Sequence, residues 1–276
     1  MYNNILDVKG IKVGQAKDLK GLTGCTVIIC EEGAICGVSK YLEERNIGFD
    51  VGVAKVPIVT GAVLFDLAVG DPKCRPNIDI GYEACKNASD KELKQGNYGA
   101  GCGATVGKIK GPEFAMKGGI GSYSIKLDNG FVVSALIAVN AFGDIYEDGK
   151  VIAGVLNDDK DKVLNSYELI KNRVNKGRFN IDNTTIGVVV TNAKLNKAEC
   201  KKISQMAHNE YAKSIFPIHT PYDGDTIFTI ATGEIESDIT LIGSLATEVV
   251  EKSVINAIKN AKNVNNIVSY EDIHQK

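Results

Sequence analysis

The sequence predicts an α/β fold built in layers with mostly antiparallel sheets, and two patterns carry this prediction. Two hairpin signals, Asp128-Asn129-Gly130 and Glu147-Asp148-Gly149, each separate a pair of strand-like apolar runs. Apolar residues with helical spacing alternate with these strand-like runs. The expected helices cover residues 39–46, 78–88, 161–173, 196–215 and 245–261. Because no repeat or linker interrupts this alternation, we expect a single domain over residues 1–276.

Runs of β-branched and apolar residues predict the remaining strands. They lie at 11–15 and 25–30, after Asn183, and from Gly224 onward. The segment 49–67 is also apolar, but Pro57 and Gly61 interrupt it. We therefore expect extended chain with a bend there rather than one continuous strand.

Composition excludes several classes of function. The net charge of −2 gives no reason to expect nucleic acid. The longest apolar stretches are only as long as a strand, so no membrane span is expected. Seven cysteines without a CxxC pair, and no secretory signal at the N-terminus, favour reduced thiols in a cytoplasmic protein. The three histidines lack metal-ligand spacing, and we expect neither a metal nor a cofactor.

Asn183-Thr184 lies where the polar segment 175–183, expected to be exposed, meets a strongly β-forming run. A threonine hydroxyl at such a junction can attack the preceding carbonyl group. Hydrolysis of the resulting ester leaves Thr184 as a new N-terminus. Its α-amino group, with an ordinary pKa near 8, can then accept the proton of the hydroxyl without a histidine. From the residues alone, the alternative is a threonine that simply begins a strand.

Four further candidates carry groups that could assist such chemistry. Asp223-Gly224-Asp225 is either a coupled carboxylate pair or a turn that caps the next strand. Asn140 ends an apolar run, so it is either a core amide or an oxyanion donor. Lys117 either stabilises an anion or is a solvated lysine, and Tyr82 either donates to an oxyanion or packs in the core.

The glycine-rich segment 101–108 does not match a phosphate-binding loop. Cys102 occupies the position of the first required glycine, and Ile109 stands where Ser or Thr should follow Lys108.

Together, the motifs of the chain resemble the DmpA-type L-aminopeptidase/D-esterase family, which includes the nylon-oligomer hydrolases. The resemblance runs from about residue 10 to residue 260. It rests on LTGCTVI (22–28), GFDVGVAKVPIVTGAVLFDL (48–67), GDPKCRP (70–76), GATVGK (103–108), MKGGIGS (116–122), VNAFGDI (139–145), NTTIGVVVTNAKL (183–195) and HTPYDGDTIF (219–228).

The resemblance implies a four-layer α-β-β-α sandwich that cuts itself between Asn183 and Thr184. The fragments would be a large chain of residues 1–183 and a small chain of residues 184–276, which stay together and assemble into oligomers. Thr184 would be the nucleophile, Asn140 and Tyr82 would hold the oxyanion, and Lys117 would line the site. Asp223 and Asp225 match the paired acidic positions. The implied substrates are small peptides or linear amide oligomers, such as those of 6-aminohexanoate.

One departure from the family follows Val38. Relatives usually continue there through a few dozen residues, which include a strand ending in a TGGS-like turn and the start of a helix. Here Val38 is followed directly by SKYLEERNIGF. The alternative hypothesis is therefore a catalytically impaired binding or structural subunit. A third hypothesis is transfer of the acyl group to an amine.

Overall fold

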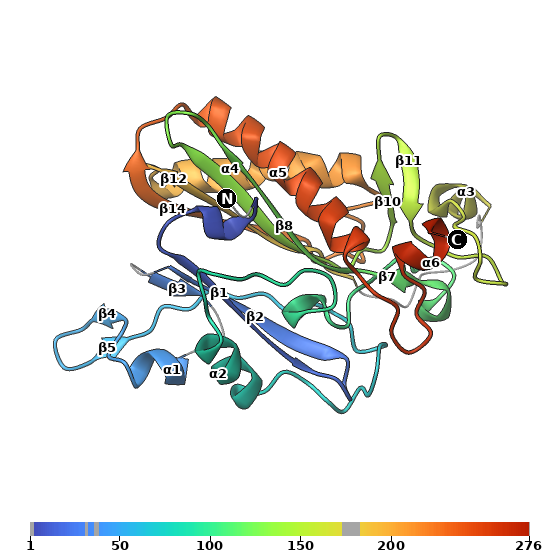
Figure 1. The fold of residues 1–276 in the computed structure, drawn as a ribbon, viewed down its shortest axis with the longest axis horizontal. Coiled ribbons are helices and arrows are strands. Elements are labelled where there is room, and N and C mark those ends of the chain that lie inside the picture. Colours follow the sequence, from blue (N-terminus) through green and yellow to red (C-terminus); the bar gives the residue numbers. More distant parts are fainter. Residues whose placement is uncertain (1–2, 31–32, 36–38, 173–182, 276) are drawn as a thin grey trace.

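Residues 3–30, 33–35, 39–172 and 183–275 are described by a computed structural model, in which four layers stack on one another (Figure 1). Helices α4 (Lys197–Ser214) and α5 (Ile239–Lys259) cover the outer face of a four-stranded sheet. A three-stranded sheet packs on its inner face, and α2 (Ile78–Lys86) covers the far side of that second sheet. This order is the predicted α-β-β-α arrangement.

The four-stranded sheet has the order β14-β12-β9-β8. The antiparallel pair β8 (Gly119–Lys126) and β9 (Val132–Val139) forms the first predicted hairpin. Strand β12 (Ile186–Ala193) is antiparallel to β9 but parallel to β14 (Thr226–Ile235). The prediction of mostly antiparallel sheets is confirmed, and the β12–β14 pair is the exception on which the site depends.

The second sheet consists of β1 (Ile11–Asp18), β2 (Thr23–Cys30) and β3 (Gly33–Ile35). Period-two alternation gives β1 an inner face, whose residues Ile11 and Val13 pack with Leu136, Val188 and Val190 of the larger sheet. On the outer face of this sheet, Val27 of β2 packs with residues of α2 and of the short helix α1 (Ser39–Glu43).

Local capping sets where the helices begin. Asn196 accepts from the N–H groups of Ala198 and Glu199 at the start of α4, as expected from its position. Asp238 does the same for α5, which therefore begins at Ile239 rather than at Leu245 as predicted. The helix predicted over 161–173 is wrong in extent, because Asn165 caps a shorter helix α3 (Ser166–Lys171).

Smaller elements complete the fold near the site. Strands β10 (Asp144–Glu147) and β11 (Lys150–Ala153) form the second predicted hairpin, and β13 (Ile215–Phe216) pairs with β10. Strand β6 (Thr105–Val106) pairs with β7 (Met116–Lys117). The remaining short elements are 3-10 turns at Ile5–Asp7, Gly99–Gly101 and Pro112–Phe114, and α6 (Tyr270–His274).

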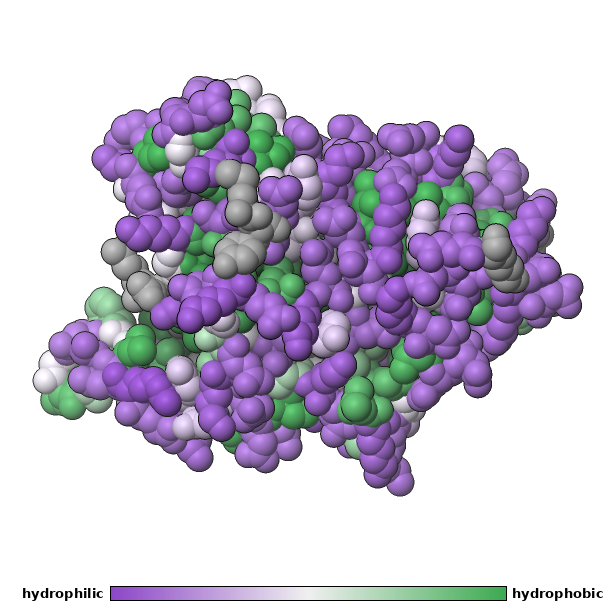
Figure 2. Space-filling model, in the orientation of Figure 1, coloured by the Kyte–Doolittle hydropathy of each residue, from purple (hydrophilic) through white to green (hydrophobic). Residues whose placement is uncertain are grey.

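The apolar segment 47–65 is largely exposed. It contains only the short strands β4 (Phe49–Asp50) and β5 (Lys55–Val56), which pair through a turn at 51–54, so the chain turns before Pro57 and Gly61 rather than at them, and no continuous strand forms. Val53 is 94% exposed and Val63 is 86% exposed. Figure 2 shows apolar side chains at the surface around this projecting segment. The point at which the sequence departs from the family falls on residues 36–38, outside the described residues, and the helix that follows, α1, spans five residues.

Asn196→Ala should lower the free energy of unfolding by about 1 kcal/mol, because two N–H groups at the start of α4 lose their acceptor. Urea denaturation measures this loss. Asn196→Asp, which keeps an acceptor oxygen at the same place, is the matched control and should retain stability. Equal losses in both variants would contradict the capping role.

Candidate active site

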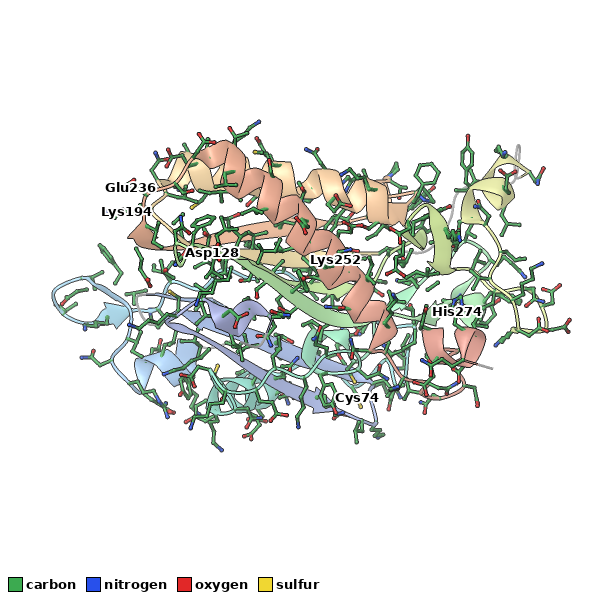
Figure 3. The ribbon with its side chains drawn as sticks, turned by 45° about the horizontal axis from the view of Figure 1, so that its top comes forward. Cys74, Asp128, Lys194, Glu236, Lys252 and His274 are labelled. Carbon is green, nitrogen blue, oxygen red and sulfur yellow. The ribbon has the colours of Figure 1, made fainter. Side chains whose placement is uncertain are left out.

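The topology of the larger sheet brings three separate segments to one edge. Because β12 and β14 are parallel, the residues that precede them, Asn183–Thr185 and Asp223–Asp225, lie side by side. Strand β9 is antiparallel to β12, so its final neighbour Asn140 reaches the same edge. The opposite ends of β12 and β14 are marked by the ion pair of Lys194 with Glu236 at 3.3 Å (Figure 3).

Hydrogen bonds hold the Asn183–Thr184 peptide bond on all sides. The Thr184 hydroxyl donates to the Asn183 carbonyl oxygen at 2.5 Å. The same oxygen accepts from the Gly224 N–H at 2.9 Å, and the Thr184 N–H donates to the Asn140 carbonyl at 3.2 Å. Asn183 is buried, in contrast to the exposure expected of it, while the rest of that polar segment, 175–182, lies outside the described residues.

The two carboxylates of Asp223 and Asp225 have different partners. Asp225 accepts from the Thr185 N–H at 2.8 Å and contacts Nδ1 of His219 at 2.9 Å, so both its oxygens are engaged. Burial raises its pKa, and the neighbouring charge of Asp223 adds to this effect. Asp223 accepts through Oδ2 from the N–H and hydroxyl of Thr220. Its Oδ1 is buried and accepts no hydrogen bond within the described part of the chain.

Asn140 is fully buried and its side chain links three segments. Its Oδ1 accepts from the Thr105 N–H at 3.1 Å and from Lys108 Nζ at 2.6 Å. Its Nδ2 donates to the Phe65 carbonyl at 3.0 Å. An amide nitrogen carries two hydrogens, so one of them is not used in that bond.

Lys108 belongs to the site, although the sequence did not predict it. Its Nζ donates to both the carbonyl oxygen and Oδ1 of Asn140. Burial lowers its pKa to about 7, against the attraction of Asp223 and Asp66. Gly107 directs the lysine inward with φ of +73°, and a side chain there would collide with the backbone of Gly154. The one feature of the sequence that could have predicted this buried lysine is its position as the only charged residue within the mostly small and apolar segment 103–109.

Lys117 is buried completely, so the solvated alternative is wrong. Its ammonium group donates to the carbonyls of Gly101, Ala104 and Gly118, at 2.7–2.9 Å. Burial lowers its pKa to about 7. All three of its hydrogens are therefore bound to backbone, and the lysine supports the glycine-rich loop that leads to Thr105 and Lys108.

The structure does not place Tyr82 with the other candidates. Tyr82 lies on α2, where its hydroxyl donates to Glu44 at 2.6 Å and its ring packs against Tyr41. These contacts are in the outer helical layer, on the other side of the second sheet. No hydrogen bond joins Tyr82 to Thr184 or Asn140 among the described residues.

A cavity of about 570 Å³ opens beside this edge, between the two sheets. Ile186 and Gly187, which follow Thr184 closely, form part of its wall, as do residues 60–67. Asp66, which the sequence analysis did not single out, also lines it. The described residues hold no cluster of three metal-ligating side chains, and no described helix is long and apolar enough to cross a membrane.

The model of peptidase family S58 matches residues 33–269. The chain belongs to this family. It is 35% identical over 259 residues to an uncharacterized aminopeptidase of Mycobacterium leprae, covering 85% of this chain and 70% of the relative. It is 26% identical over 306 residues to a 6-aminohexanoate-oligomer endohydrolase of Paenarthrobacter ureafaciens, covering 92% of this chain and 85% of the relative. The S58 protein is thus an amide hydrolase.

Solved structures show the same fold. The L-aminopeptidase D-Ala-esterase/amidase of Ochrobactrum anthropi, described as a variant of the Ntn-hydrolase fold, matches with a TM-score of 0.69 at 16% identity, over 98% of this chain and 92% of that chain. The PH0078 protein of Pyrococcus horikoshii matches with a TM-score of 0.69 at 21% identity, over 97% of this chain and 89% of that chain. The S58 protein therefore has an Ntn-hydrolase fold.

Lys117→Met should lower the free energy of unfolding by about 2–4 kcal/mol, because three backbone carbonyls lose a charged donor inside the protein. Urea denaturation at pH 7 measures the loss. Lys126→Met on the exposed end of β8 is the control and should change stability little. A small effect of Lys117→Met would show that the three hydrogen bonds are not needed.

Stability should rise as pH increases from about 7 toward 10. The folded protein releases the Lys108 proton near pH 7, while the unfolded chain keeps it to about pH 10.5, so unfolding takes up a proton in this range. Each lysine with such a lowered pKa raises the free energy of unfolding by up to about 1.4 kcal/mol per pH unit in this range. Denaturation of Thr184→Ala at pH 6.5 and 9 tests this. Adding Lys108→Met should remove part of the gain, whereas an unchanged gain would contradict a lowered lysine pKa.

Proposed function

We propose that the S58 protein cuts its own chain before Thr184 and then hydrolyses amides with that threonine as its N-terminal nucleophile. The observation that supports this proposal is the position of the Thr184 hydroxyl, 2.5 Å from the carbonyl oxygen of the preceding residue. In this position the hydroxyl lies next to the carbonyl group whose carbon it would attack. The Gly224 N–H on the same oxygen is a donor in the place where an oxyanion would develop.

Self-cleavage proceeds in two balanced steps. The Thr184 oxygen bonds to the carbonyl carbon of Asn183, the C–N bond breaks, and the hydroxyl proton passes to the released nitrogen. The product is an ester between the Asn183 acyl group and the Thr184 side chain. Water then hydrolyses the ester, which leaves a carboxylate on Asn183 and a free amine and hydroxyl on Thr184. The chains would contain 183 residues and 276 − 183 = 93 residues.

Hydrolysis of an external amide repeats this chemistry. The α-amine of Thr184 accepts the hydroxyl proton while the oxygen attacks the substrate carbonyl. The second hydrogen of Asn140 Nδ2 donates to the oxyanion and stabilises it. Lys108 holds the Asn140 side chain in position through its hydrogen bond to Oδ1. The buried Oδ1 of Asp223 is an acceptor for the new amine, and Asp225 holds the backbone of Thr185. Water then releases the acyl group.

The proposed substrates are small peptides or linear amide oligomers. The first relative named above is an aminopeptidase, and the second acts on 6-aminohexanoate oligomers. We propose that the two cleaved chains stay associated, since β12 of the small chain pairs with β9 of the large one. Further assembly into a homo-oligomer of such pairs belongs to the same proposal. The alternative of an inactive binding subunit gains no support from the family or from these relatives.

Thr184→Ala should yield only the full-length chain, because no side-chain oxygen remains to attack Asn183. Thr184→Ser should still cleave, since it keeps the hydroxyl. Denaturing electrophoresis and intact mass distinguish one chain from two. Thr185→Val is the matched control and should cleave like the wild type, because the hydroxyl of Thr185 makes no hydrogen bond within the described structure.

The purified, cleaved protein should hydrolyse leucine p-nitroanilide or 6-aminohexanoate oligomers, and Thr184→Ala should not. Cleavage in Thr184→Ala at the wild-type position would contradict the role of the hydroxyl. Self-cleavage of the wild type without turnover of any amide or ester would instead favour the hypothesis of an inactive subunit. Transfer of the acyl group to an added amine would favour the third hypothesis, acyl transfer.

A further inference from the structure

The cavity between the two sheets has an apolar lining that includes Ile186, two residues after Thr184. Ile120, Leu136, Val188 and Phe228 form its wall on the larger sheet, and Ile28 contributes from β2. Its volume of about 570 Å³ lies within the range of small-molecule sites. A substrate whose carbonyl group sits at Thr184 can therefore extend an apolar side chain or a methylene chain between the sheets.

Asp66 is the one acidic residue among the described residues that line this cavity. It follows Phe65, whose carbonyl oxygen accepts from Asn140 Nδ2 at 3.0 Å, so Asp66 is the next residue along the chain from the one that contacts the proposed oxyanion donor. No cation of the described chain is within ion-pair distance of it. The nearby lysines are committed elsewhere, Lys117 to three carbonyls and Lys108 to Asn140.

The other carboxylates of the site are poor candidates for binding a substrate cation. Both oxygens of Asp225 have partners in Thr185 and His219. Asp223 is held through Oδ2, and its buried Oδ1 is assigned above to the amine of Thr184. Among these three carboxylates, only that of Asp66 lines the cavity. Its neighbour Phe65 contacts the side chain of Asn140.

We propose that Asp66 binds the free ammonium group of the substrate and that the interlayer cavity takes the apolar remainder of its acyl part. The proposal rests on the function proposed above and defines its substrate class as amides whose acyl part carries both a free amine and a hydrocarbon chain. Burial raises the pKa of Asp66, which marks a carboxylate that gains from a cationic partner. The charges of Lys108 and Lys117 lower this pKa, but neither lysine forms an ion pair with Asp66, so a bound ammonium group would be its direct ionic partner.

The test compares two substrates that differ only in the amine, leucine p-nitroanilide and 4-methylpentanoyl p-nitroanilide. The wild type should prefer the first. Asp66→Asn, which keeps the shape and removes the charge, should reduce the ratio of the two kcat/KM values by roughly 10- to 100-fold. Asp66→Glu should restore part of the preference. Asp128→Asn, in the exposed hairpin turn, is the control and should leave the ratio unchanged.

A preference for the amine that persists in Asp66→Asn would overturn the proposal, as would an equal fall in the activity on both substrates. A second measurement separates this outcome from failure of the proposed function. Calorimetric titration with 3-methylbutan-1-amine needs no hydrolysis. The amine should bind the cleaved wild type and bind Asp66→Asn about tenfold or more weakly. Equal binding to both, or no binding to the wild type, rejects Asp66 whether or not the protein turns over amides.

Discussion

The parallel pairing of β12 with β14 is the constraint on which the rest of the site depends. Side-by-side parallel strands place the residues before them at one edge, and here these are Asn183–Thr185 and Asp223–Asp225. The Gly224 N–H consequently reaches the Asn183 carbonyl oxygen that the Thr184 hydroxyl also contacts. An antiparallel pairing would place the two segments at opposite ends of the sheet. The parallel β12–β14 pair in an otherwise antiparallel sheet thus brings the residues of the proposed active site together.

Two buried lysines hold the surroundings of this edge in place. Lys117 donates to two carbonyls of the glycine-rich segment 101–108 and to that of Gly118, and Lys108 donates to both oxygens of Asn140. Burial of an ammonium group is costly unless it is hydrogen-bonded, so each lysine stabilises only the arrangement that satisfies it. This requirement fixes Asn140 beside Thr184. Neither lysine contacts the threonine itself, and both act on the residues around it.

The sequence predicted the helices, strands and turns better than it predicted which side chains contact one another in the folded protein. Hairpins at Asp128–Gly130 and the cap at Asn196 depend on local chemistry, and both are found. The contacts of Lys108 and Asp66 depend on the packing of distant segments, which local patterns do not record. Tyr82 shows the same limit, because a helical tyrosine is compatible with either face and here it donates to Glu44. The roles proposed for Thr184, Asn140 and the acidic pair came from family motifs, and the topology explains why those motifs lie together.

The central claim is that one hydroxyl both breaks the chain and becomes the catalyst. N-terminal sequencing of the smaller polypeptide in purified protein tests this claim most directly. Our account requires a second N-terminus that begins Thr-Thr-Ile-Gly-Val, at residue 184. A polypeptide that remains whole while it hydrolyses amides, or a second N-terminus at any other residue, would contradict it.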